Sequence, residues 1–216
     1  ISDIQYYFEG NMAMKKVWNK GKAVGQMKPL NPKQVRMIKD ALTSKGDLKS
    51  LRDLALFSSA IDTMLRSVDL LNLRVEDVQD ERGEMKERFW ILQQKTGKRH
   101  LVEITEGTRE VLKEWISKSR KFEEDFLFTG TRKGKFQAIS REQYALLVKK
   151  WIREFAQADP KEYSTHSLRR TKAALVYKRT GNIEAVRQLL GQHNVNATSV
   201  YLNVGQEDAL AIAREV

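Results

Sequence analysis

Apolar residues recur at intervals of three and four over most of the chain, a period that predicts α-helices. Asn31-Pro32 combines a capping side chain with a proline suited to a first turn, and Gly46-Asp47 marks the start of a second helix. The pattern predicts further helices at residues 68–73, 108–118, 141–158, 167–179, 182–190 and 195–202, and a tail helix with Ala209, Leu210 and Ile212.

The helical period is interrupted between residues 88 and 104. The segments 89–92 and 101–104 are short and apolar, and the polar turn Lys95-Thr96-Gly97-Lys98 separates them. Two such segments around a turn predict an antiparallel hairpin. The expected fold is therefore mainly α with a small antiparallel β-sheet, an α+β class.

The first thirty residues differ from the rest. An aromatic-rich start is followed by a basic stretch that contains Gly21 and Gly25. Residues 1–30 are therefore expected to be an N-terminal extension or linker, and residues 31–216 one folded domain.

Charge points to a polyanionic partner. The 216 residues contain 39 Lys and Arg against 28 Asp and Glu, a net charge of +11. A basic surface attracts nucleic acid, because phosphates supply most of the affinity in such complexes. The chain has no apolar run long enough to span a membrane and no signal peptide pattern, so no membrane association is expected.

Residue content also narrows the chemistry. Cysteine is absent, which excludes disulfides and thiolate catalysis and fits a reducing compartment. The only histidines are His100, His166 and His193, and no two stand at a metal-binding helical spacing. Neither a metal nor another cofactor is expected.

Two short clusters in the first half could bind a phosphate. Asp69 follows Arg66 by three residues and could orient its guanidinium on a helical turn; the alternative is a surface ion pair. Lys95 lies at the predicted hairpin tip, where its ammonium could enter a groove or simply be solvated.

Two further clusters lie near the C-terminus. In His166-Ser167-Leu168-Arg169 the first and last side chains share one face of a helix start, where the helix dipole favours a phosphate. The alternative is a capping histidine beside a basic helix. Leu190-Gly191-Gln192-His193 precedes Tyr201, which could be a nucleophile or a core tyrosine.

Together the clusters provide what phosphoryl transfer at a diester requires. Arginines can neutralise the non-bridging oxygens, a tyrosine hydroxyl can attack, and a lysine or histidine can move protons.

The ordered set Arg66, Lys95, His166 to Arg169, Leu190 to His193 and Tyr201 resembles the tyrosine recombinase, or phage integrase, family. The resemblance covers residues 31–216 and implies that family's catalytic-domain fold. It implies that Arg66 and Arg169 grip the scissile phosphate and that Lys95 protonates the leaving 5′ oxygen. It further implies that His166 acts as acid/base, that Tyr201 forms a 3′-phosphotyrosyl bond, and that Asp69 supports the site.

Three departures from the family pattern stand out. The family usually has histidine or tryptophan directly after the Leu-Gly pair, whereas this chain has Gln192, with His193 one residue later. Glutamine can donate a hydrogen bond but cannot carry a proton at neutral pH, so either residue could serve there. Met64 replaces a common glycine. About thirty leading residues cannot supply the usual N-terminal DNA-clamping domain, so the chain is a fragment or a short relative.

The resemblance implies a site-specific recombinase or integrase of a mobile element, acting on double-stranded DNA as a homo-oligomer, a tetramer, with possible accessory DNA-bending proteins. The implied location is cytoplasmic and nucleoid-associated, in a bacterial or phage-derived setting. Two alternatives are a type IB topoisomerase-like enzyme that relaxes supercoils, and a DNA-binding regulator with weakened catalysis. The tail from Gly205 to Val216 is expected to dock on a neighbouring subunit or on its own domain.

Overall fold

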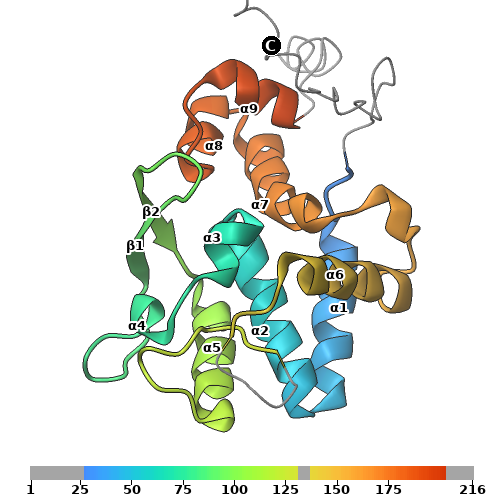
Figure 1. Cartoon of the computed structure of the whole chain (residues 1–216). Helices are drawn as coiled ribbons and strands as arrows, with labels where there is room; N and C mark the ends of the chain where they lie inside the picture. Colours follow the sequence, from blue (N-terminus) through green and yellow to red (C-terminus); the bar gives the residue numbers. More distant parts are fainter. Residues whose placement is uncertain (1–26, 131–136, 203–216) are drawn as a thin grey trace, which may run out of the picture.

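The computed structural model describes residues 27–130 and 137–202, with the backbone alone at Val200 and Tyr201 (Figure 1). The predicted tail helix and most of the predicted N-terminal extension lie outside the described residues. The elements in chain order are α1 (Pro32–Lys45), α2 (Leu48–Thr63), α3 (Ser67–Leu71), α4 (Val75–Val78), β1 (Arg88–Leu92), β2 (Arg99–Glu103), α5 (Glu106–Ser119), α6 (Arg141–Glu154), the 3-10 helix η1 (Pro160–Glu162), α7 (Thr165–Thr180), α8 (Ile183–Leu189) and α9 (Val195–Leu202).

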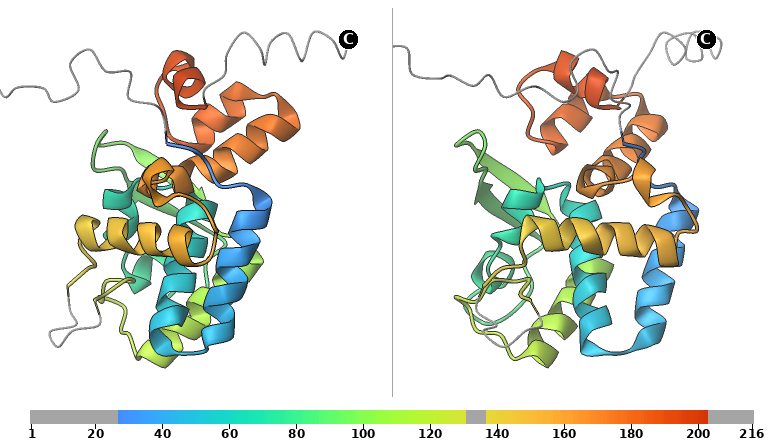
Figure 2. Two further views of the ribbon diagram at one scale, coloured as in Figure 1. Left: turned by 90° about the vertical axis from the view of Figure 1, so that its right-hand side faces the viewer. Right: turned by 45° about the vertical axis from the view of Figure 1, so that its right-hand side comes forward.

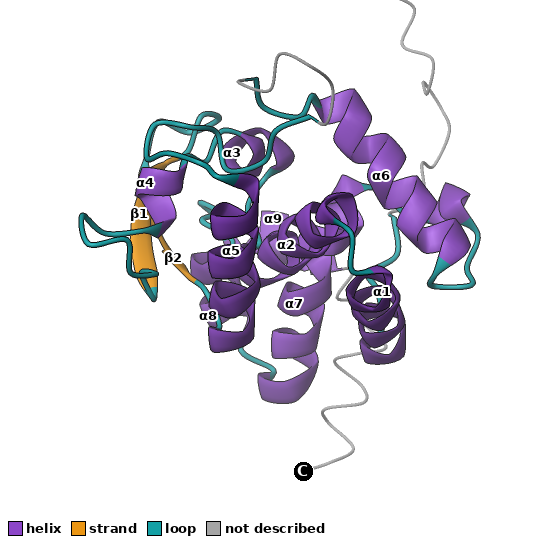
Figure 3. Cartoon of the chain, turned by 90° about the horizontal axis from the view of Figure 1, so that it is seen from below, coloured by secondary structure: helices purple, strands orange, loops and turns teal. Residues whose placement is uncertain are grey.

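Helix α2 is the centre of the fold. It contacts α1, α5 and α7, and Phe57 on α2 packs edge-on against Trp151 of α6. Seen from below, these helices surround α2 (Figure 3). Helix α2 is accordingly buried over most of its length, and its buried side chains include apolar groups and also polar ones such as Ser58 and Ser59.

Local capping signals set the first helix boundaries as the sequence predicts. The Asn31 side chain accepts a hydrogen bond from the Gln34 amide, and the Asp47 side chain accepts from the amides of Lys49 and Ser50. Gly46 takes a left-handed conformation between the two helices, with φ of 63°. Each cap satisfies amides that have no partner within the helix.

The predicted hairpin is confirmed. Strands β1 and β2 pair antiparallel, with Phe89 opposite Val102 and Ile91 opposite His100. Phe89 and Val102 are buried, while Trp90, Leu92 and Leu101 are exposed on the other face. The loop between the strands extends toward α8, far from the first helices (Figure 1).

Helices α8 and α9 pack against α7 (Figure 2). Side chains from this region form a second, smaller core. Met64, Ala173, Val186 and Leu190 are its buried members. Met64 ends α2 in the left-handed region, with φ of 50°. A glycine would adopt this conformation without strain, so the methionine has a backbone cost of roughly 1–2 kcal/mol that its buried side chain offsets.

The predicted boundaries fail at one long helix. Helix α6 ends at Glu154, four residues before the predicted 141–158. Gln157 takes a left-handed conformation with φ of 51°, which no continuing helix allows. The apolar pattern continues because Phe155 and Ala156 still pack on the core after the helix has ended. The short elements α4 and η1 were not predicted, since four or fewer residues carry no periodic signal.

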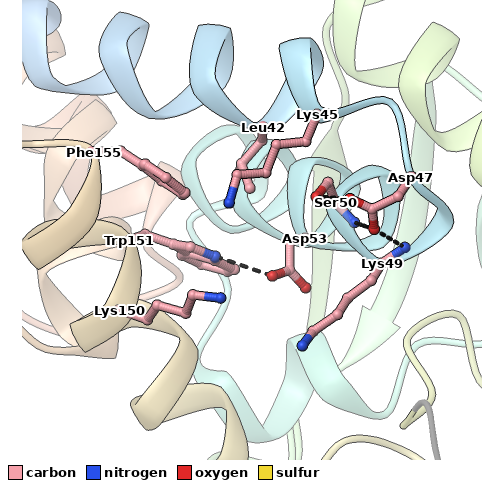
Figure 4. A pocket seen from close by; sticks show the side chains of 9 residues that line it. All are labelled: Leu42, Lys45, Asp47, Lys49, Ser50, Asp53, Lys150, Trp151 and Phe155. Carbon is pink, nitrogen blue, oxygen red and sulfur yellow. Dashed lines mark hydrogen bonds between the residues drawn. The ribbon is translucent and has the colours of Figure 1, made fainter.

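A buried ion pair lies in the N-terminal half of α2. The Arg52 side chain donates to Asp53 Oδ1 at 2.6 and 3.0 Å, and Trp151 Nε1 donates to Asp53 Oδ2 at 3.2 Å. Figure 4 shows Trp151 reaching across a pocket from α6 to this carboxylate. The pair therefore joins α2 to α6 at the end of α2 remote from Arg66.

We expect Asp53→Ala to lower the free energy of unfolding by about 3–5 kcal/mol, because the Arg52 charge would stay buried without its carboxylate. Chemical denaturation would measure the change. Asp40→Ala, at an exposed position on α1, is the matched control and should change stability by about 0.5 kcal/mol or less. Equal effects of the two substitutions would contradict this account.

Candidate active site

Arg66 lies three residues after the end of α2 and stands at the N-cap of α3. Its Nη1 donates to Gln93 Oε1 at 3.0 Å and lies 3.9 Å from Asp69 Oδ2. Asp69 is buried, and its Oδ1 accepts from the backbone amide of Gln94 at 2.9 Å. The predicted pair of Arg66 and Asp69 is thus a partly buried contact that also reaches the hairpin, and not a surface ion pair.

Lys95 is exposed in the tight loop between β1 and β2. The amide of Gln93 donates to the Lys98 carbonyl at 2.9 Å, and the amide of Gly97 donates to the Gln93 carbonyl at 2.8 Å. These bonds close the loop. The ammonium is therefore carried on a short, hydrogen-bonded turn.

The first turns of α7 carry His166 and Arg169. Ser164 caps this helix by accepting from the His166 amide at 3.2 Å, so the helix begins two residues before the predicted start at Ser167. Arg169 is 3% exposed, and its Nη2 donates to the Leu190 carbonyl at 2.6 Å. The guanidinium therefore holds the C-terminal end of α8 as well as facing the site.

The electrostatics of His166 show which charges gather around it. Burial lowers the pKa of His166 below its usual 6.5, and the positive charges of Arg169, Arg66 and Lys95 lower it further. The four residues predicted from separate parts of the sequence therefore share one electrostatic environment. At neutral pH the imidazole is neutral and able to accept a proton.

The turn after α8 contains Gln192 and His193, the two residues that follow the Leu-Gly pair. Gln192 is half-buried, and its Oε1 accepts from Thr198 Oγ1 at 2.7 Å, so the carboxamide oxygen faces α9. Arg187 Nη1 donates to the Gln192 carbonyl at 2.6 Å. His193 is exposed, and its Nδ1 lies 3.4 Å from Lys98 Nζ at the hairpin.

Tyr201 lies in α9, one residue before the end of that helix. Its side chain falls outside the described residues. The helix that carries it packs against α7 and α8.

The structure adds three residues at the site that the sequence did not single out. Gln93 is buried between Arg66 and the hairpin turn, Lys98 meets His193, and His100 packs at Gly191. The sequence predicts His100 only as a possible metal ligand. It lies just before the predicted apolar segment 101–104, and the structure includes it in β2 opposite Ile91. Burial lowers the pKa of His100, and the nearby charges of Arg169 and Arg66 add to that shift.

The arrangement suits an anion more than a metal. Within residues 27–130 and 137–202, no group of three or more His, Asp or Glu is placed to hold a metal ion. Two guanidiniums can neutralise the non-bridging oxygens of a phosphodiester, while an ammonium can protonate a leaving oxygen and a neutral imidazole can accept the proton of an attacking hydroxyl. No helix in the same residues has the length and apolar character to cross a membrane.

A family model and the sequences of known proteins point to the same family for this chain. The family model described as the phage integrase family matches residues 28–208. The probable integrase/recombinase YoeC of Bacillus subtilis is 33% identical over 165 residues, which cover 76% of this chain and 83% of YoeC. A tyrosine recombinase of Pseudothermotoga lettingae is 31% identical over 185 residues, covering 82% of this chain and 61% of that protein.

Solved structures share the fold at lower identity. The XerH site-specific recombinase, in a post-cleavage complex with its palindromic difH substrate, has a TM-score of 0.70 at 20% identity. The match covers 94% of this chain and 57% of that one. The XerA recombinase has a TM-score of 0.68 at 18% identity, and the match covers 90% of this chain and 65% of XerA. The expected fold, mainly helical with a small antiparallel sheet, is thereby confirmed.

We expect stability to fall as the pH is lowered from about 7.5 to about 5.5, partly because of His100. Its folded-state pKa lies below 6.5, so the unfolded chain binds the proton first. The stabilisation is complete above the unfolded-state pKa and is lost as the pH falls through the folded-state value. Thermal unfolding across this range should show a shallower pH dependence in His100→Gln than in the wild type. An identical slope in the variant would rule out this contribution.

Proposed function

The chain belongs to the phage integrase family, and from that membership we propose that it is a tyrosine-type site-specific recombinase or integrase acting on double-stranded DNA. It would cleave and rejoin strands through a 3′-phosphotyrosyl intermediate on Tyr201. Solved complexes of related recombinases with their DNA substrates support DNA as the partner.

One observation carries the proposal more than any other: the positive charges of Arg169, Arg66 and Lys95, which come from α7, the start of α3 and the hairpin loop, all act on His166. Gathering like charges is unfavourable unless an anion occupies the site. A backbone phosphate has the charge and the oxygens to fill that role, and arginine's planar fork matches its geometry.

The proposed reaction is a phosphoryl exchange. The Tyr201 oxygen attacks phosphorus and forms a new P–O bond, while the bond from phosphorus to the 5′ oxygen breaks. Lys95 gives a proton to the departing 5′ oxygen, and neutral His166 accepts the phenol proton. Arg66 and Arg169 stabilise the negative charge on the non-bridging oxygens. A 5′ hydroxyl from a partner strand then reverses the step, so the exchange consumes no ATP.

The two residues after the Leu-Gly pair, Gln192 and His193, have different surroundings. The Gln192 oxygen is engaged by Thr198, which leaves its amide nitrogen as the group that could donate to a phosphate. His193 is exposed and touches Lys98, so it would need a shift of the turn to reach the phosphate. We propose that Gln192 donates a hydrogen bond and that proton transfer rests on His166 and Lys95.

Two alternatives lead to different products. A type IB topoisomerase-like enzyme would relax supercoils without exchanging partners, and a regulator with weakened catalysis would retain DNA without cleaving it. Gln192, in place of the usual histidine or tryptophan, motivates the regulator. His166 argues against the topoisomerase-like enzyme, because topoisomerases of this kind tend to have lysine at that position.

Several finer expectations stay predictions. These are the division at residue 30, the tetramer on DNA, accessory DNA-bending proteins, and a cytoplasmic, nucleoid-associated location. The support of the site by Asp69 also stays a prediction, although its buried contact near Arg66 favours that role.

We expect the protein to form a covalent adduct with a nicked suicide duplex that carries its recombination site. Such a duplex loses the 5′ hydroxyl fragment after cleavage, so the phosphotyrosyl species accumulates on a denaturing gel. Tyr201→Phe should bind the duplex and form no adduct, because it lacks the attacking oxygen. Retention of DNA without any wild-type adduct would favour the regulator, and relaxation of supercoils without strand exchange would favour the topoisomerase.

We expect Arg66→Ala to slow adduct formation by about 10²–10³-fold, since removing one donor to a transition-state oxyanion typically has that effect. DNA affinity should change far less, because many other basic groups contact the backbone. Arg36→Ala, at an exposed position on α1, is the matched control for lost charge. Cleavage at the wild-type rate in Arg66→Ala would show that the site is wrongly placed.

A further inference from the structure

Gln93 is a buried polar residue for which the proposed reaction has no role. It follows β1 directly, at the base of the loop that carries Lys95, and is 1% exposed. Its side-chain oxygen is hydrogen-bonded, whereas Nε2 is buried with no hydrogen-bond partner among the described residues, so the partners of the oxygen indicate why the carboxamide is there.

The side-chain oxygen of Gln93 joins two parts of the site. Oε1 accepts from Arg66 Nη1 at 3.0 Å and from Thr96 Oγ1 at 3.0 Å. Because a guanidinium can only donate, the oxygen and not the NH2 group must face Arg66. This choice fixes the orientation of the whole carboxamide and turns its nitrogen away from the arginine.

The backbone of Gln93 closes the loop that carries Lys95. Its amide donates to the Lys98 carbonyl at 2.9 Å, and its carbonyl accepts from Gly97 at 2.8 Å. One residue therefore binds Arg66 through its side chain and sets the conformation of the Lys95 loop through its main chain.

The nitrogen of Gln93 packs against a third part of the site. A Cβ placed on Gly191 would overlap Gln93 Nε2 and would lie 3.2 Å from Gln93 Cδ and 3.0 Å from His100 Nδ1. Gly191 also has φ of 58°, so both its conformation and the lack of space require glycine. The preceding carbonyl, of Leu190, is held by Arg169. The carboxamide therefore lies against the turn that leads toward α9.

We propose that Gln93 is a positioning residue that fixes Arg66, the Lys95 loop and the Gly191 turn relative to one another. The inference rests on the proposed function, because it gives these three parts their role in strand cleavage. It adds that their alignment depends on one carboxamide in the closed space between the hairpin and α8. Small displacements of reacting groups cost large factors in rate, whereas DNA binding depends on many dispersed charges.

The first test compares Gln93→Met with the wild type. Methionine has nearly the same length and volume but neither accepts from Arg66 and Thr96 nor fixes an orientation. With saturating suicide duplex, the single-turnover rate of adduct formation should fall by about 10- to 100-fold. The dissociation constant for the same duplex should stay within about twofold. Gln143→Met, an exposed glutamine on α6, is the matched control and should retain the wild-type rate.

A second measurement on the same variant does not depend on activity. Hydrogen exchange should become faster in residues 94–98 and 189–192 together, while α1 keeps its wild-type exchange. If the wild type forms no adduct, the proposed function fails. The exchange result still tests whether Gln93 links the Lys95 loop to the Gly191 turn. Exchange that rises in residues 94–98 alone, or an unchanged cleavage rate in Gln93→Met, would overturn the role assigned to Gln93.

Discussion

Repulsion between like charges is the constraint on which this site depends. Burial lowers the pKa of His166, and the positive charges of Arg169, Arg66 and Lys95 lower it further, so these cations lie within electrostatic range of one imidazole. Cations gathered in this way would separate unless the fold held each one. Arg66 is held by a carboxamide oxygen and a nearby buried carboxylate, and Arg169 is held by the carbonyl at the end of α8.

The nature of these acceptors matters for function. Gln93 and the Leu190 carbonyl are neutral dipoles, so they orient the guanidiniums without cancelling their charge. Asp69 carries a full charge, but it lies 3.9 Å from Arg66 and also accepts from the Gln94 amide. The site therefore keeps a positive field, and its donors are already oriented for the phosphate that we propose it binds. The repulsion among the cations is the driving force that a bound phosphate would relieve.

Prediction from the sequence succeeded where the signal is local. Asn31 and Asp47 cap their own helices, and the turn between residues 95 and 98 sets the hairpin, because each feature involves neighbours along the chain. It failed at the end of α6. Phe155 and Ala156 continue the apolar pattern while the backbone has already left the helix, since burial against the core does not require helical geometry.

The sequence by itself determined the residue types of the site, their order and the local elements that carry them, because side-chain chemistry and periodicity are properties of short segments. It also identified Arg66, Lys95, His166 and Arg169 as candidates for one centre through their resemblance to a known family. Only the tertiary structure decided that Gln93 lies between Arg66 and Gly191, and that Arg169 holds the end of α8. Such contacts join segments that meet only when the hairpin and α8 pack together. Because these segments are far apart in the sequence, no local pattern predicts which of their side chains will be in contact.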